Sequence, residues 1–236
     1  MSGPRYDLAH ARGNRGAARI CILDTGLSAA MPAHALWDFS GSGIRVDANH
    51  GTLMTRVVYD VCPDAWVWFG KVTGGNDVWG AIADGIRWAV ASKVDAVSIS
   101  LVAYLGFGQG ADPRVGKAVA DALAAGVGIF ASAGNDRSRT DLPTPAAFTG
   151  VCRCAWDQHI PPGSTAVWPV GNGMSSVATA AIAAAYGLYL ATDNNTARRR
   201  CRYLLADAGL NPFSHWRDVD LPWLRNSAGV PYCGNL

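Results

Sequence analysis

The chain has 236 residues, of which half are hydrophobic and 16% are charged, and its formal net charge is +2. This length and apolar content suffice for the large core of an α/β protein. The near-neutral charge does not provide the field of a nucleic-acid-binding or membrane-surface protein, and the longest apolar run, 177–190, is too short to span a bilayer and is broken by Gly187. We therefore expect neither nucleic acid nor membrane as a partner.

The N-terminus and the cysteines indicate the cellular compartment in which we expect the protein. Residues 1–7 lack the apolar core of a signal peptide, so we expect a cytoplasmic protein. None of the six cysteines forms a Cys-x-x-Cys pair, which argues against structural zinc. We expect mostly reduced, buried thiols, with Cys152 and Cys154 on one strand face and badly spaced for bonding; a disulfide involving Cys201 or Cys233 stays open. No carboxylate cluster identifies calcium ligands, and we expect no metal site and no cofactor.

The first predicted strand, 18–23, is apolar apart from Arg19 and leads into Asp24-Thr25-Gly26. This is the pattern of a buried parallel strand that carries a carboxylate at its C-terminal end, the edge where open α/β sheets bind ligands. The same tripeptide also fits a plain turn or half of an aspartic-protease site. A second Asp-Thr/Ser-Gly is absent, which counts against the aspartic protease.

A polar loop, 39–49, precedes His50-Gly51-Thr52, and the helical spacing that follows places His50 at a helix start on the same sheet edge. A lone histidine there is more often a cap or loop residue than a base. A second strand is predicted over 66–72, and Asp77 caps a helix that continues to Val90.

The second half of the chain repeats the order of a strand followed by a helix. A third strand is predicted over 96–101, Asp112-Pro113 opens a helix that Gly126 ends, and the strand 127–131 leads to Asn135. Further predicted elements are a strand over 151–156, a helix from Asn195 to about 208, and an ordered coil over 209–236. Alternation of strands and helices predicts an α/β fold with three layers: a mostly parallel sheet flanked by helices, in one domain over 1–236 with its core at about 18–208.

The stretch 173–190 places two serines after a glycine and before an uncharged, Ala-rich helix. Backbone N–H groups and the helix dipole at such an N-terminus would stabilise an oxyanion beside Ser176. The stretch by itself more often describes a buried helix with a serine cap.

Four residues now fall at strand ends or helix starts on one edge, in the order Asp24, His50, Asn135 and Ser176. In this order and in its local motifs the chain resembles the subtilisin-like serine proteases. The pieces that carry the resemblance are Ile22-Leu23-Asp24-Thr25-Gly26, His50-Gly51-Thr52, Val94 to Leu101, Ala133-Gly134-Asn135-Asp136 and Ser176-Val177-Ala178.

The resemblance implies a serine endopeptidase. Ser176 would be the nucleophile, His50 the general base, Asp24 the group that orients the imidazole, and Asn135 a side-chain donor to the oxyanion. The implied partner is a peptide or protein substrate. It would lie as an added strand along Ser100, Leu101 and Val102, with Ser132, Ala133 and Gly134 lining the first specificity pocket.

The chain also departs from the family pattern. Met174-Ser175 replaces the Gly-Thr that usually precedes the nucleophile, and Val102 stands where the family has a glycine. Aligning Met174 with the family's methionine would leave Gly173 at the nucleophile, but the small residues of the helix favour Ser176. The alternative function is a catalytically inactive pseudoprotease that binds extended peptides. A dinucleotide-binding protein is disfavoured, since the first strand is not followed by Gly-x-Gly-x-x-Gly.

Overall fold

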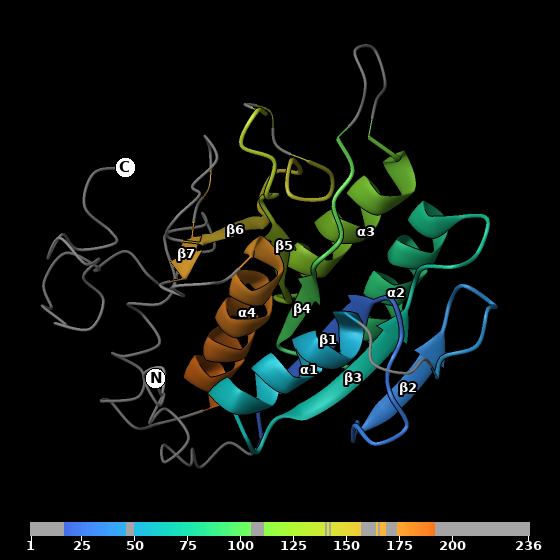
Figure 1. Ribbon diagram of the computed structural model, residues 1–236, viewed down its shortest axis with the longest axis vertical. Coiled ribbons are helices and arrows are strands. Elements are labelled where there is room, and N and C mark those ends of the chain that lie inside the picture. Colours follow the sequence, from blue (N-terminus) through green and yellow to red (C-terminus); the bar gives the residue numbers. More distant parts are fainter. Residues whose placement is uncertain are drawn as a thin grey trace, which may run out of the picture.

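The computed structural model describes residues 17–45, 50–104, 111–139, 141, 143–156, 164, 166–168 and 174–191 (Figure 1). The predicted helix over 195–208 and coil over 209–236 lie outside the described residues, as do Gly173, Cys201 and Cys233.

A seven-stranded sheet forms the centre of the fold, in the order β2-β3-β1-β4-β5-β6-β7, and every neighbouring pair is parallel. The predicted α/β class with a parallel sheet is confirmed. The strands are β1 (Arg19–Asp24), β2 (Ala35–Asp38), β3 (Trp66–Lys71), β4 (Ala96–Ile99), β5 (Gly128–Ser132), β6 (Cys152–Trp156) and β7 (Ala166–Trp168).

Helices cover both faces of the sheet (Figure 1). The helices are α1 (His50–Val61), α2 (Val78–Ala91), α3 (Pro113–Ala124) and α4 (Ser175–Ala191). On one face α1 packs beside α4, and on the other face α2 packs beside α3. The prediction of helices on both faces is therefore confirmed.

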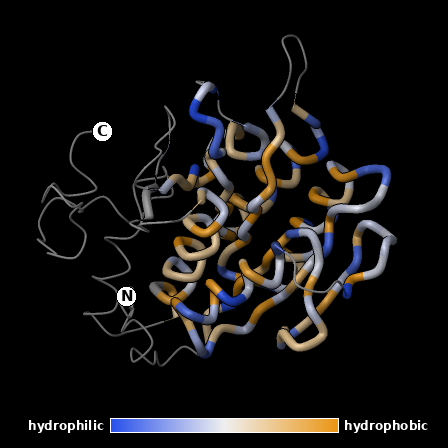
Figure 2. The backbone as a smooth tube through the Cα atoms, viewed as in Figure 1, coloured by the Kyte–Doolittle hydropathy of each residue, from blue (hydrophilic) through white to orange (hydrophobic). Residues whose placement is uncertain are grey.

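Burial on both faces explains why β1 is an almost continuous apolar run. Ile20 and Ile22 belong to the core beneath α1 and α4, whereas Cys21 and Leu23 belong to the core beneath α2 and α3. Because successive side chains of a strand point to opposite faces, a strand between two helical layers needs apolar residues at every position. The hydrophobic colouring of the central strands in Figure 2 follows this arrangement.

The helix α4 is buried on nearly all sides, and Ala180 to Ala185 are at most 1% exposed. It contacts β4, β5, β6 and α1. Its small side chains allow this close approach to the sheet, which explains a helix without a polar face.

Two strands, β2 and β7, were not predicted. They contain four and three residues and form the two edges of the sheet. On β2 the side chain of Trp37 is 58% exposed, so the segment carries no clear apolar pattern. Such short edge strands are defined by pairing with a neighbour more than by their own sequence.

The described cysteines agree with the expectation of reduced, buried thiols. Cys21, Cys62, Cys152 and Cys154 are buried and are not joined in disulfides. The sulfur atoms of Cys152 and Cys154 lie 3.9 Å apart, so they are not bonded. Within the described part of the chain, no helix is both long and apolar enough to cross a membrane.

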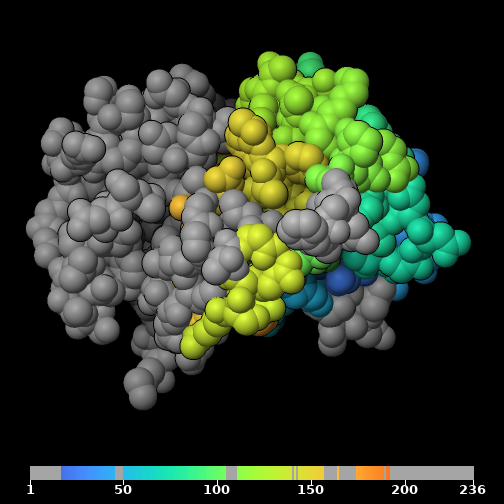
Figure 3. Space-filling model, turned by 90° about the horizontal axis from the view of Figure 1, so that it is seen from above, coloured from blue at the N-terminus to red at the C-terminus, as the bar shows by residue number. Residues whose placement is uncertain are grey.

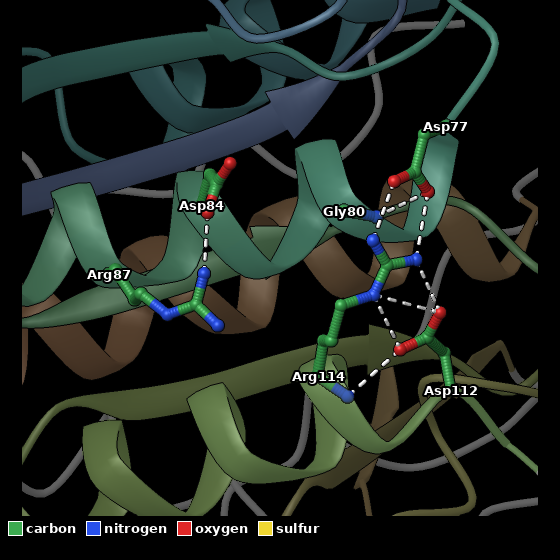
Figure 4. A network of polar contacts seen from close by, with 6 residues as sticks. All are labelled: Asp77, Gly80, Asp84, Arg87, Asp112 and Arg114. Carbon is green, nitrogen blue, oxygen red and sulfur yellow. Dashed lines mark hydrogen bonds and ion pairs between the residues drawn. The ribbon is translucent and has the colours of Figure 1, made fainter.

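An arginine joins the N-terminal caps of α2 and α3 (Figure 4). Asp77 and Asp112 cap the helices by accepting hydrogen bonds from the backbone N–H groups of Gly80, at 2.9 Å, and Arg114, at 2.8 Å. The Arg114 guanidinium lies between the two carboxylates and contacts both, at 2.6 and 2.7 Å. Its hydrogen bonds lower the pKa of each aspartate, so both caps stay ionised.

We predict that Asp77→Ala lowers the thermal midpoint by a few degrees, roughly the effect of a lost helix cap, since it removes both the cap and the ion pair. Asp77→Asn should lose less, because asparagine caps as well as aspartate. Scanning calorimetry at low and high salt separates the two contributions: the deficit of Asp77→Asn should shrink with salt. Equal midpoints for both variants would contradict the capping role.

Candidate active site

Asp24 ends β1 with a fully buried carboxylate that is satisfied by local donors. Its Oδ1 accepts a hydrogen bond from the Thr25 backbone N–H at 2.7 Å. The His50 Nδ1 lies 2.8 Å from Oδ1 and 3.0 Å from Oδ2. A carboxylate in this setting orients the imidazole and favours the tautomer with its proton on Nδ1. The predicted hydrogen bond between Asp24 and His50 is confirmed.

A close approach between the start of α1 and the end of β1 brings His50 to Asp24. A Cβ built on Gly51 would overlap the Gly26 carbonyl oxygen and lie 2.7 Å from Cζ of Phe69. The Gly51 N–H donates to the Thr25 hydroxyl at 3.3 Å, which ties the two segments together. Glycine at position 51 is therefore a packing requirement of the site.

The contact with Asp24 changes the titration of His50. The hydrogen bond that the His50 side chain donates to Asp24 is the main cause that raises the His50 pKa, while partial burial acts in the opposite direction. The imidazole is 30% exposed. Its Nε2 makes no hydrogen bond to any residue that the structure describes.

The two serines at the start of α4 have different surroundings. Ser175 is fully buried and its hydroxyl hydrogen-bonds to that of Ser132. Ser176 is 6% exposed, and its hydroxyl has no hydrogen bond to another described residue. Its carbonyl accepts a hydrogen bond from the Ser100 hydroxyl at 3.1 Å. Ser175 is thus engaged in the core, whereas the hydroxyl of Ser176 has no partner among the residues that the structure describes.

Asn135 follows β5 and is exposed, yet its amide is oriented. Its Oδ1 accepts a hydrogen bond from the Ser175 backbone N–H at 2.8 Å. Because only the oxygen can accept, the Nδ2 group is left to donate elsewhere. Asn135 therefore presents an amide donor beside the start of α4.

The predicted peptide-binding segments lie after β4 and at the end of β5. The backbones of Leu101 and Val102 make no hydrogen bond to another described residue, and the Val102 side chain is 42% exposed. The hydroxyls of Ser100 and Ser132 are used internally, as described above, and Ala133 is fully buried. Side chains of Ser100, Ser132 and Ala133 are thus directed to the core, and a substrate would meet backbone there.

The predicted residues form two groups. Asp24 and His50 make one, at β1 and α1, while Ser176 and Asn135 make the other, at α4 and β5, joined through the Ser175 N–H. The helices α1 and α4 pack against each other, so both groups lie on one side of the sheet. No hydrogen bond links His50 to Ser176 among the described atoms. Nor do the described residues contain a group of three potential metal ligands.

A model of the subtilase family matches residues 16–167, more than half of the chain. The chain belongs to this family. The matched range includes Asp24, His50 and Asn135 and ends before the serines of α4.

Two curated relatives agree with this membership, and a solved structure shares the fold. Subtilisin DY of Bacillus licheniformis is 30% identical over 167 residues, covering 62% of this chain and 59% of that protein. The major intracellular serine protease of Bacillus subtilis (strain 168) is 29% identical over 166 residues, covering 56% of this chain and 49% of that protein. The self-cleaved protease domain of PatA has a TM-score of 0.62 at 19% identity, covering 80% of this chain and 88% of that one. The chain thus spans about half the length of these curated relatives, and the solved structure shares its fold.

Some residues of the site escaped sequence reasoning. The motif Asp24-Thr25-Gly26 does not show that the Thr25 backbone N–H donates to the Asp24 carboxylate, and the hydroxyl contact between Ser132 and Ser175 joins residues 43 positions apart. Tyr104, which lies against Gly134, follows the predicted peptide-binding segment without any periodic signal. Long-range contacts of this kind leave no local pattern that could have revealed them.

We predict that His50 titrates above the ordinary histidine value of about 6.5, because Asp24 favours the imidazolium form. Asp24→Asn should lower the His50 pKa, since the hydrogen bond and the negative charge are both weakened. NMR titration of the imidazole protons in both proteins measures the difference. An unchanged His50 pKa in Asp24→Asn would contradict the coupling.

Proposed function

We propose that this protein is a serine endopeptidase that uses Asp24, His50 and Ser176 as a catalytic triad and Asn135 as an oxyanion donor. The observation that carries the proposal is the buried Asp24 carboxylate hydrogen-bonded to His50 Nδ1 at 2.8 Å. A buried aspartate that orients a partly exposed imidazole is the arrangement that makes histidine an effective general base. Family membership and protease relatives support the same reaction class.

In the proposed reaction the Ser176 Oγ attacks the peptide carbonyl carbon while its proton passes to His50 Nε2. Asp24 stabilises the imidazolium that forms. The carbonyl oxygen gains negative charge and accepts a hydrogen bond from Asn135 Nδ2 and from the backbone N–H of Ser176. The intermediate collapses as His50 returns the proton to the leaving amine, and a water molecule hydrolyses the acyl-enzyme by the same steps.

The reaction requires a neutral imidazole, and the elevated pKa of His50 sets where this form prevails. The rate should therefore rise with pH as His50 loses its proton. The midpoint of this rise should follow the His50 pKa that the NMR titration measures.

The alternative is a pseudoprotease that binds extended peptides without cleaving them. The exposed Val102 and Met174, at positions where the family differs, are its support. A binding module would need neither the buried Asp24 nor its contact with His50, so we favour the enzyme.

We predict opposite effects for the two serines of α4. Ser176→Ala should abolish peptide cleavage and covalent labelling by a fluorophosphonate, with little loss of stability. Ser175→Ala should keep labelling but lose about 1–3 kcal/mol of stability, because the buried Ser132 hydroxyl would lose its partner. Labelling followed by mass spectrometry, together with urea unfolding, measures both effects.

The matched control for this pair is the double variant Ser132→Ala/Ser175→Ala, which removes both hydroxyls and should recover part of the stability lost by Ser175→Ala alone. Loss of labelling only in Ser175→Ala would reassign the nucleophile. Wild-type protein that neither labels nor cleaves would favour the pseudoprotease.

For Asn135 we predict a loss of turnover of roughly 10²–10³, the magnitude known for such donors in subtilisins, on substitution by alanine. The substrate KM should change much less, since the oxyanion exists only near the transition state. Asn135→Asp is the control: it keeps an acceptor for the Ser175 N–H but loses the donor. Steady-state kinetics should show both variants impaired, whereas full activity of Asn135→Asp would exclude donation by the amide.

A further inference from the structure

In the proposed function, the positions of Ser176 and Asn135 determine where the side chain of the residue before the scissile bond would lie. The reacting carbonyl must lie within bonding reach of Ser176 Oγ while its oxygen is about 3 Å from Asn135 Nδ2. A substrate strand would pair with the open backbone of Leu101 and Val102. The residue that carries this carbonyl therefore has its side chain between the segment after β4 and the backbone of Ala133 and Gly134.

The side chain of Tyr104 extends into this region. Tyr104 follows the open backbone by two residues, and its phenol reaches across to Gly134. A Cβ built on Gly134 would overlap the Tyr104 hydroxyl and lie 3.0 Å from Cζ and 3.6 Å from Cγ of Pro143. The phenol therefore lies directly against the backbone that immediately precedes Asn135.

The position of Tyr104 is held from several sides. The Ala103 and Thr144 backbones exchange two hydrogen bonds, at 3.1 and 2.9 Å, which hold the chain just before the tyrosine. The guanidinium of Arg139 lies 4.5 Å from the centre of the Tyr104 ring, within the range of a cation–π contact. Asp141 pairs with this guanidinium at 2.8 and 2.6 Å.

The loop that carries Arg139 lies beyond β5, on the face viewed in Figure 3. Burial raises the pKa of the Tyr104 hydroxyl, so the phenol remains uncharged at neutral pH. The Tyr104 side chain is thus uncharged, and it is held by the hydrogen-bonded backbone of Ala103 and by the Arg139 guanidinium over its ring.

We propose that Tyr104 occupies the space beside Gly134 that would otherwise receive the substrate side chain preceding the scissile bond, and thereby restricts cleavage to sites after glycine, alanine or serine. A phenol ring and a large substrate side chain cannot share this space, and moving Tyr104 would break its contact with Arg139. This inference rests on the proposed function and names the substrate class of the same site.

The test compares peptides that differ only in the residue before the scissile bond, alanine in one and phenylalanine in the other. Wild-type kcat/KM should favour alanine by at least about tenfold. Tyr104→Ala should reverse or abolish this preference by making room for phenylalanine. Tyr104→Phe is the matched control, since it keeps the ring and should keep the preference for alanine. Circular dichroism and thermal melting check that both variants fold.

A second measurement separates this inference from the proposed function. Calorimetry on Ser176→Ala measures the binding of product peptides that end in alanine or phenylalanine, with and without Tyr104→Ala. If Ser176→Ala prefers the peptide that ends in alanine and the added Tyr104→Ala change removes this preference, the role of Tyr104 is supported. This holds even if the wild-type protein proves unable to cleave or label. Three results would overturn the role of Tyr104, whatever the catalytic result. They are equal use of both substrates by the wild type, a preference that Tyr104→Ala leaves unchanged, and binding of neither product peptide.

Discussion

The contact between the buried Asp24 carboxylate and His50 is the interaction on which the site depends. A carboxylate at 0% exposure needs donors, and it finds them in the Thr25 N–H and the His50 Nδ1. The imidazole reaches it only because Gly51 allows α1 to start against the Gly26 carbonyl. Burying an unpaired charge would be costly, so this contact links the stability of the sheet edge to the orientation of the histidine.

The start of α4 places two neighbouring serine hydroxyls in different surroundings. Ser175 bonds to Ser132 and gives its N–H to Asn135, and Ser176 rests on Ser100 through its carbonyl. The same backbone thus locks the helix onto β5 and aims the Asn135 amide. The same few hydrogen bonds serve core packing and hold the proposed oxyanion donor Asn135 and the proposed nucleophile Ser176 on rigid elements.

The surroundings of the site bear on the proposed specificity more than on the proposed chemistry. The Val102 side chain is 42% exposed beside the open backbone after β4, and Tyr104 lies against Gly134 with Arg139 on its ring. Loops after parallel strands vary freely while the strands keep their positions, because the core constrains only the latter. A chain can therefore keep strand-end residues such as Asp24 in place while the loops beside them vary.

By itself the sequence determined the parallel α/β class, the main strands and helices, and the order in which Asp24, His50, Asn135 and Ser176 appear. Apolar runs such as 18–23 and capping residues such as Asp77 are local signals, and local physics suffices to interpret them. The short strands β2 and β7, the division of labour between Ser175 and Ser176, and the placement of Tyr104 against Gly134 depended on tertiary structure. Each arises from contacts between residues distant in the chain, whose free energy depends on packing that no short segment encodes.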